Sequence, residues 1–268
     1  AALFCGAVYA GAWPVPLPLP TSFGGKESYI DQIMVQLNSC DPSILFFPPE
    51  LAEMAGEAAK RCKVEGIDWA EFNDRIALKT DLPQATTDEV CYLQYSSGST
   101  RFPHGVAVTH RALLDNLHSH GVATEVQDSD RCISWLPWYH DMGLVGILTS
   151  AMVRGVDLVL AGPQSFMASP SRWVEWLSTY GGTITAGPNF SWVLATRALK
   201  RADATLDLST LTLALSGAEP VDPRADPGVA MLHRELLHLP AAAVEAARLA
   251  GVGGLAQRGA ALARLLVE

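Results

Sequence analysis

Short apolar runs of strand length alternate with longer amphipathic windows along most of the chain. Several windows open with Pro, Ser or Thr, which suit the first turn of a helix. Strands that alternate with helices in this way predict an α/β fold with parallel sheets flanked by helices. The predicted strands are 43–47, 90–95, 106–108, 132–136, 158–161, 183–186 and 211–215, with an edge strand and linker in 63–89, and the predicted helices are 50–62, 110–120, 143–153, 169–180 and 189–201.

The first twenty residues are almost wholly apolar, yet they do not predict a membrane span or a signal peptide. Prolines at positions 14, 16, 18 and 20 interrupt any helix, and no basic segment precedes the apolar run. We therefore expect a buried helix over 1–11, an extended segment over 13–20, and no transmembrane segment.

Composition narrows the function classes. With 268 residues, 49% of them hydrophobic, the chain can bury the core of one large domain or two small ones. A net charge of −9 argues against a nucleic-acid partner, because phosphate contacts need clustered Lys and Arg. Five scattered cysteines without a Cys-x-x-Cys pair are typical of reduced, mostly buried thiols in a cytoplasmic protein; they are Cys5, Cys40, Cys62, Cys91 and Cys132.

The strand predicted at 90–95 runs into a loop of small hydroxylated residues, followed by a Pro-x-Gly turn. Hydroxyl groups and glycine-freed backbone N–H groups suit the wrapping of a polyphosphate. The Gly-Lys-Ser/Thr ending of a Walker loop is missing, so an ordinary P-loop enzyme is not indicated. A plain Ser/Gly surface loop is the alternative interpretation. The loop residues are Ser96, Ser97, Gly98, Ser99, Thr100 and Arg101.

Four stretches, in order, resemble motifs of the adenylate-forming superfamily, and their wording is closest to that of the fatty acyl-AMP ligases. The first is a proline-rich segment, the second the phosphate loop, the third an aromatic-His-Asp motif and the fourth a small-residue turn. Four agreements in order make the resemblance specific over residues 1 to about 222. The stretches read PLPLPTSFGG at 16–25, QYSSGSTRFPHGV at 94–106, WLPWYHDMGL at 135–144 and SGAEPV at 216–221.

The resemblance implies a two-step reaction in which a fatty acid and ATP give acyl-AMP and pyrophosphate, and a thiol then takes the acyl group. The phosphate loop would hold the triphosphate, with Mg²⁺ as cofactor. Many members of the superfamily carry Lys in the Pro-x-Gly element, whereas this chain has His104, which leaves Arg101 as the fixed cation of the loop. His140 would line the junction of the acyl and nucleotide sites; a core histidine held by Asp141 is the alternative.

The same resemblance implies an acyl pocket and an adenine and ribose site. Asn189 could instead cap a helix, and Glu219 could be a solvated acid. No residue pattern predicts a protein-bound metal site: His118 and His120 lack a matching second ligand pair. The acyl-pocket residues are Trp138, Tyr139, Gly187, Asn189 and Phe190, and the adenine and ribose residues are Ser216, Gly217, Ala218, Glu219 and Pro220.

The composition changes after residue 222. The stretch 223–268 has no aromatic residue and no Lys, and Ala and Leu fill almost half of it. Either an amphipathic helical tail or translation in a shifted frame accounts for this composition, and we favour the frameshift. We therefore predict a partial adenylation domain over 1–222 and a non-homologous tail over 223–268, and expect the chain to be an internal piece of a longer enzyme.

The leading hypothesis is thus the nucleotide- and acyl-binding half of a fatty acyl-AMP ligase. Its acyl group would pass to an acyl carrier protein or polyketide synthase in lipid or polyketide synthesis. An AMP-forming acyl-CoA ligase is the nearest alternative. A second alternative is a truncated remnant that binds nucleotide without turnover, because the family's later motifs do not follow residue 222.

Overall fold

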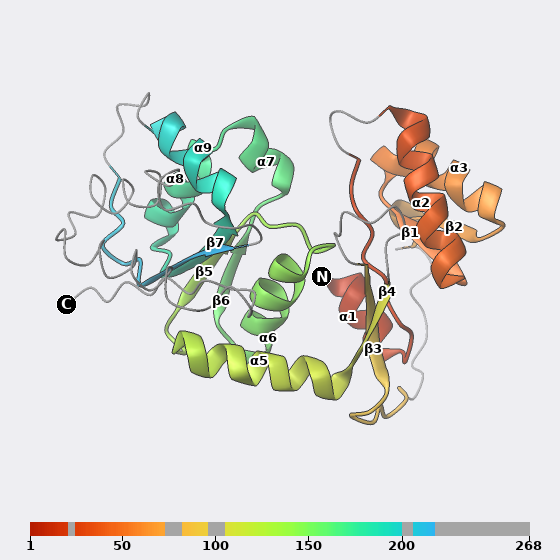
Figure 1. Ribbon diagram of the computed structural model, residues 1–268, viewed down its shortest axis with the longest axis horizontal. Coiled ribbons are helices and arrows are strands. Elements are labelled where there is room, and N and C mark those ends of the chain that lie inside the picture. Colours follow the sequence, from red (N-terminus) through yellow and green to blue (C-terminus); the bar gives the residue numbers. More distant parts are fainter. Residues whose placement is uncertain (21–24, 73–81, 96–104, 200–205, 218–268) are drawn as a thin grey trace. The chain divides into compact units, whose positions relative to one another are not determined.

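The computed structural model describes residues 1–20, 25–72, 82–95, 105–199 and 206–217 (Figure 1). They belong to two compact units, Ala1–Leu113 and Leu114–Glu268, and helix α5 (His110–Thr124) crosses the division. The predicted phosphate loop and the predicted tail lie outside the described residues, so both stay predictions.

The first unit packs two helices, α2 and α3, over a short parallel pair of strands, β1 and β2. Helix α2 was not predicted from the sequence, although Ile30, Ile33 and Leu37 recur at helical spacing and are almost fully buried. The predicted helix over 50–62 and the edge strand within 63–89 are both confirmed. The elements are α2 (Lys26–Cys40), β1 (Ile44–Phe47), the 3₁₀ turn η1 (Pro49–Leu51), α3 (Ala52–Cys62), β2 (Glu65–Asp68) and α4 (Trp69–Phe72).

The first helix, α1 (Ala2–Tyr9), forms where it was predicted, but the prediction that it is buried is wrong. None of its residues is buried, and Tyr9 is 68% exposed. The helix is apolar on all sides, so its sequence does not specify a face to bury. Its Phe4 ring meets Tyr92 edge-on, with 5.7 Å between the ring centroids.

Strands β3 (Val90–Tyr95) and β4 (Gly105–Thr109) form an antiparallel hairpin. The expectation of parallel pairing is wrong for these two strands, because the residues between them are too few for a crossover helix. The next helix begins with a side-chain cap: the hydroxyl of Thr109 accepts a hydrogen bond from the N–H of Ala112 at 3.1 Å. That helix, α5, continues to Thr124.

The second unit contains a parallel sheet of four strands in the order β6-β5-β7-β8, as the α/β pattern predicted (Figure 1). The strand order reverses direction between β5 and β7, because the chain leaves β5 toward β6 and then returns to the other side. Right-handed crossovers place the helices of the two directions on opposite faces of the sheet. The strands are β5 (Arg131–Ser134), β6 (Asp157–Leu160), β7 (Ile184–Pro188) and β8 (Leu213–Gly217).

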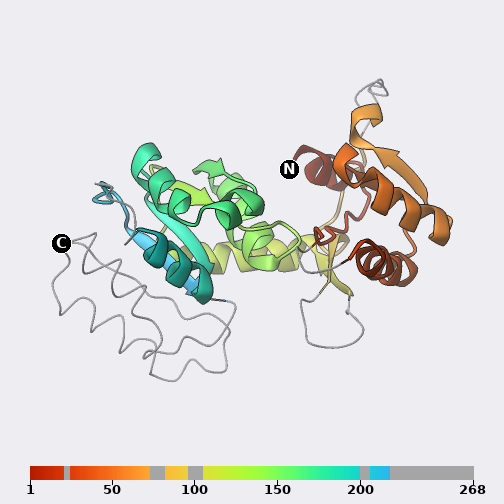
Figure 2. The same ribbon diagram turned by 90° about the horizontal axis from the view of Figure 1, so that it is seen from above.

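The helices follow that rule. Helices α8 and α9 lie on one side of the sheet, and α6 lies on the other (Figures 1 and 2). The helix predicted over 143–153 is present, but its first part has the wider turn of a π-helix. Helix α7 was not predicted. The helices are the π-helix η3 (Met142–Thr149), α6 (Ser150–Arg154), α7 (Pro163–Ala168), α8 (Ser171–Tyr180) and α9 (Asn189–Leu199).

An aromatic cluster fills the core on the α8 side. Trp135 stacks on Phe166 with 3.8 Å between ring centroids, and Trp173 lies edge-on to both. The indole N–H of Trp173 donates to the hydroxyl of Thr185 at 2.9 Å, and that hydroxyl donates to the carbonyl of Ile133 at 2.7 Å. The cluster therefore joins a helix to both central strands.

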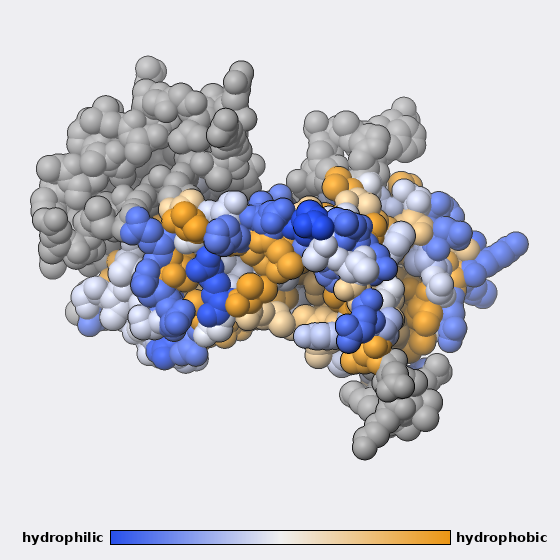
Figure 3. Space-filling model, turned by 90° about the horizontal axis from the view of Figure 1, so that it is seen from below, coloured by the Kyte–Doolittle hydropathy of each residue, from blue (hydrophilic) through white to orange (hydrophobic). Residues whose placement is uncertain are grey.

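Outside these cores the surface carries both apolar and hydrophilic residues. In Figure 3, apolar residues on the face seen from below lie between hydrophilic ones. Among the described residues no helix has both the length and the apolar character needed to span a membrane.

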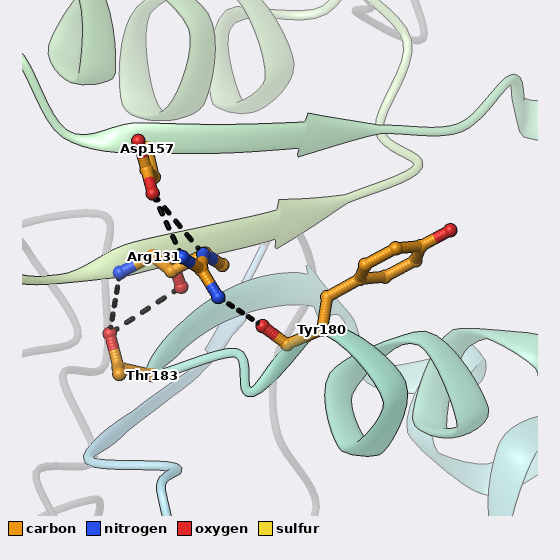
Figure 4. A network of polar contacts seen from close by, with 4 residues as sticks. All are labelled: Arg131, Asp157, Tyr180 and Thr183. Atoms are coloured by element: carbon orange, nitrogen blue, oxygen red, sulfur yellow. Dashed lines mark hydrogen bonds and ion pairs between the residues drawn. The ribbon is translucent and has the colours of Figure 1, made fainter.

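A polar network holds the amino ends of the strands together (Figure 4). The guanidinium of Arg131 donates to Asp157 at 3.0 Å and to the carbonyl of Tyr180 at 2.6 Å. The N–H of Arg131 donates to Thr183, whose hydroxyl also donates to Asp130 at 2.6 Å. Each of these residues thus has partners on a neighbouring element, so the polar groups named at this edge of the sheet are hydrogen-bonded within the protein.

We expect Thr185→Val to destabilise the second unit by about 1–3 kcal/mol, because it leaves the buried N–H of Trp173 without an acceptor. Urea unfolding followed by tryptophan fluorescence measures the change. Thr179→Val is the matched control, since Thr179 is exposed on α8, the helix that carries Trp173. An unfolding midpoint equal to that of the control would show that the Thr185 hydroxyl contributes nothing.

Candidate functional site

Three groups of predicted site residues come together at the carboxyl edge of the four-stranded sheet. His140 follows β5, Asn189 opens α9 directly after β7, and Gly217 ends β8. Because the three strands are parallel and adjacent, their carboxyl ends share one edge. That edge includes the point between β5 and β7 where the strand order reverses, which is where open α/β sheets bind ligands.

The sequence placed Gly187 and Ser216 in turns after strands, and this is corrected here. Both are strand residues, paired with each other in the register of β7 and β8. The phosphate-loop residues, together with Ala218, Glu219 and Pro220, lie outside the described residues. Their predicted roles therefore stay predictions.

A tight turn presents His140. The N–H of His140 donates to the carbonyl of Pro137 at 3.3 Å, and the carbonyl of His140 accepts from Leu144 at 2.9 Å. A side chain at Gly143 would overlap the carbonyl of Pro137, so only glycine lets the turn close this tightly. Met142 then lies beside Gly217, where an added Cβ would be 3.1 Å from its terminal methyl group. The His140 turn therefore sits next to the end of β8.

Asp141 binds His140 from the adjacent position. Its Oδ1 lies 2.7 Å from His140 Nδ1 and accepts from the N–H of Met142 at the same distance. The Met142 N–H also lies 3.3 Å from His140 Nδ1, but that nitrogen serves one bond at a time. We assign the proton of Nδ1 to the shorter bond with Asp141. Nε2 then remains as the acceptor of the neutral ring, or as a donor when the ring is charged.

The hydrogen bond between His140 and Asp141 also shifts the pKa values of both residues. The hydrogen bond to Asp141 raises the pKa of His140 above its usual value, against the opposing effect of burial. The same bond lowers the pKa of Asp141. The alternative interpretation of a histidine held by Asp141 is thus correct for this contact, and it leaves the second ring nitrogen for a ligand. Asp141 is largely exposed, with 74% of its side chain accessible, so water screens the pair.

The aromatic residues beside His140 differ in burial. Trp138 and Tyr139 are half-buried, and burial raises the pKa of the Tyr139 hydroxyl. Trp135, which belongs to the predicted aromatic-His-Asp motif and was interpreted as pocket wall or core, is almost fully buried. Its indole N–H has no hydrogen-bond partner among the described residues.

The end of β7 and the start of α9 contribute the next group of predicted site residues. Gly187 has no room for a side chain, because a Cβ would lie 2.6 Å from the Ser191 hydroxyl and 2.7 Å from the Trp173 ring. Asn189 does not cap helix α9, contrary to the alternative prediction, since its buried Oδ1 accepts no hydrogen bond from any described residue. Phe190 is 45% exposed, and its place in an acyl pocket stays a prediction.

Buried polar atoms without partners gather at this edge. In the described ranges they include Trp135 Nε1, Asn189 Oδ1 and Ser216 Oγ. More than nine in ten buried polar groups in proteins are hydrogen-bonded, so these three need partners from other residues or from a ligand. Within the same ranges no three His, Cys, Asp or Glu side chains converge as metal ligands. The edge can therefore offer hydrogen bonds and one imidazole, which suit binding and orienting a polar ligand.

Replacing Asp141 with Asn should lower the pKa of His140, because the ring loses its carboxylate partner. The raised pKa stabilises the folded state below the pKa of the unfolded histidine, about 6.5, and this contribution disappears as the pH rises through the folded value. The loss of stability in Asp141→Asn should therefore be larger at pH 5.5 than at pH 8.5.

Proton NMR of the histidine ring follows the titration, with His140→Gln to assign the resonance. Asp128→Asn is the matched control, because Asp128 is an exposed acid of the same unit. An unchanged His140 pKa in Asp141→Asn would contradict the assigned bond.

Comparison with known proteins places these features in a family. The model of the family described as AMP-binding enzyme matches residues 1–231. A putative acyl-CoA synthetase of Caulobacter vibrioides is 38% identical over 199 residues, which are 72% of this chain and 34% of that protein. The long-chain-fatty-acid–AMP ligase FadD32 of Mycobacterium marinum is 36% identical over 232 residues, or 82% of this chain and 36% of that protein. The chain thus spans about a third of the length of these relatives.

Solved structures of fatty acyl-adenylate ligases have the same fold as this chain. A fatty acyl-adenylate ligase from a study of the Escherichia coli and Legionella pneumophila enzymes superposes with a TM-score of 0.80 at 32% identity, covering 87% of this chain and 42% of that chain. The Legionella pneumophila ligase in complex with acyl adenylate and pyrophosphate gives 0.76 at 28% identity, covering 87% and 40%. The predicted resemblance to fatty acyl-AMP ligases is confirmed, and the chain belongs to the AMP-binding enzyme family.

Proposed function

We propose that this chain forms the nucleotide- and acyl-binding part of an enzyme that activates a fatty acid with ATP to acyl-AMP. The observation that carries the proposal is the set of buried, unpartnered polar atoms at the carboxyl edge of the sheet, the edge at which His140 also lies. A relative of known structure holds an acyl adenylate and pyrophosphate, and this chain matches two fifths of its length. A carboxylate and a nucleotide would supply the acceptors and donors that the edge needs.

In the proposed reaction a carboxylate oxygen attacks the α-phosphorus of ATP, and the bond to the bridging oxygen of pyrophosphate breaks. No proton has to move, so catalysis depends on position and charge. His140, with Asp141 fixing the proton on Nδ1, would direct Nε2 toward the substrate and orient the carboxylate. Because the bond to Asp141 raises the pKa of His140, the ring keeps its positive charge to a higher pH than an ordinary histidine, which also favours an anionic partner.

The phosphates would be held by Ser96, Ser97, Gly98, Ser99, Thr100 and Arg101, the loop that follows β3. Mg²⁺ would enter with ATP, with phosphate oxygens as its main ligands. The described part of the site offers one carboxylate, Asp141, and its Oδ1 is already engaged. Its residues therefore fit a metal that is bound through phosphate.

We further propose that the acyl group passes to the thiol of an acyl carrier protein or polyketide synthase in the cytoplasm. The motif wording that resembles the fatty acyl-AMP ligases supports this acceptor. One relative is named a putative acyl-CoA synthetase and another a long-chain-fatty-acid–AMP ligase, so coenzyme A is the competing acceptor. A further relative is named a 4-hydroxyphenylalkanoate adenylyltransferase, which widens the range of acids to consider.

The test combines ATP binding by calorimetry with detection of dodecanoyl-AMP by mass spectrometry. Formation of the adenylate would support the proposed enzyme, and binding without product would favour the nucleotide-binding remnant. Absence of both would overturn the proposal for this chain. Where the adenylate forms, adding carrier protein or coenzyme A identifies the acceptor.

The double variant Ser97→Ala and Thr100→Ala should weaken ATP binding about thirtyfold, because each hydroxyl contributes on the order of 1 kcal/mol to a charged ligand. Ser129→Ala is the matched control, since Ser129 lies in an exposed loop of the other unit. Equal ATP affinity in the double variant and the control would remove the phosphate loop from the proposed site.

A further inference from the structure

A small cavity lies on the face of the sheet covered by η3 and α6. Its volume is about 30 Å³, and its wall is almost entirely apolar. The apolar side chains come from three strands and from both helical segments. They include Cys132, Ile184, Leu213, Leu215, Ile147 and Ala151.

This cavity is on the same face as the proposed site. Along β8, Leu213, Leu215 and Gly217 alternate with residues of the other face, so all three point toward η3. Gly217 lies beside Met142, next to the His140 turn, whereas Leu213 and Leu215 line the cavity. Four residues of strand span about 13 Å, so the cavity lies below the site along the strand direction.

Three polar side chains, Ser150, His120 and Arg154, also line this cavity. The Nδ1 atom of His120 is buried and has no hydrogen-bond partner in the described part of the chain. Burial, together with the charge of Arg154, holds the pKa of His120 below its usual value, so the ring is neutral and available as a donor or acceptor.

The guanidinium of Arg154 packs against helix α5 at Gly121. A side chain at Gly121 would overlap its guanidinium, which shows how closely the group packs on the backbone of that helix. The described residues give the guanidinium neither a hydrogen bond nor an ion pair with a carboxylate. A cation at an apolar cavity without an acidic partner leaves its donors for an acceptor from outside, and the apolar wall strengthens that interaction.

We infer that the cavity receives the far end of the acyl chain and selects chains whose far end carries a hydrogen-bond acceptor, best a carboxylate. This inference rests on the proposed function, because it assumes that the carboxyl group to be activated lies near His140. The apolar side chains of β8 and η3 would contact the methylene groups between the two ends. Arg154 would bind the distal oxygen atoms, and His120 would add one hydrogen bond.

The alternative is that water fills the cavity and joins His120 to Arg154. A cavity of this size holds water when polar partners are present. In that case the protein would recognise the far end of the acyl chain through apolar contacts alone.

The experiment uses two acyl sulfamoyl adenosines, stable mimics of acyl-AMP whose nucleotide end fixes the direction of binding. One carries a dodecanoyl chain and the other the same chain with an ω-carboxylate. We expect the protein to bind the mimic with the ω-carboxylate about tenfold more tightly than the dodecanoyl mimic. We expect this preference to disappear in Arg154→Met.

Gly121→Ala provides a second variant that keeps every charge. Its new methyl group should displace the flexible end of Arg154, because the helix backbone is harder to move, and should abolish the preference too. Arg172→Met is the matched control: Arg172 is exposed on α8, and this variant should keep the preference. Circular dichroism shows whether each variant has folded.

The outcomes separate this inference from the proposed function. If neither mimic binds, the proposed nucleotide and acyl site is overturned, and this inference with it. If both bind equally, or if the preference survives in both Arg154→Met and Gly121→Ala, only this inference is overturned.

Discussion

The hydroxyl of Thr185 joins the two central strands of the second unit, and the arrangement of the site depends on that junction. The register of β5 and β7 pairs one residue of each strand, Cys132 with Ile184, and the N–H of Thr183 donates to the carbonyl of Arg131 just before it. One residue further along, Thr185 donates to the carbonyl of Ile133 and accepts from Trp173. A buried side chain thus continues the connection between the strands at the point where the strand order reverses, and it ties both strands to α8.

The two edges of this sheet differ in how completely their polar groups are satisfied. At the amino edge, Arg131 and Thr183 bond to neighbouring elements and form a closed network. At the carboxyl edge, Trp135 and Asn189 keep buried atoms without partners in the described ranges. Because unpaired buried groups cost free energy, the satisfied amino edge contributes to stability, whereas the unsatisfied carboxyl edge suits the proposed ligand.

The sequence was sufficient to predict the α/β class, the parallel sheet and the place of His140. These depend on hydrophobic periodicity and on motif order, which are local properties. It did not predict that the indole N–H of Trp135 lacks a partner among the described residues, or that Gly143 has to lie against Pro137, since both follow from tertiary contacts. The π-helical start of η3 was also missed, because eight apolar and small residues give the same pattern for either kind of helix.

That π-helix links the two ends of the proposed acyl site. Asp141 caps its first turn and also orients His140, while Thr149 at its end bonds back to the carbonyl of Leu144 at 3.0 Å, five residues earlier. Helix α6 continues from it without a break and ends with Arg154. Because one continuous helical segment positions the imidazole at the carboxyl edge and the guanidinium at the cavity, its wider turns set the separation between the two groups. In the proposed enzyme, the length of acyl chain that reaches both ends would therefore be determined by this segment.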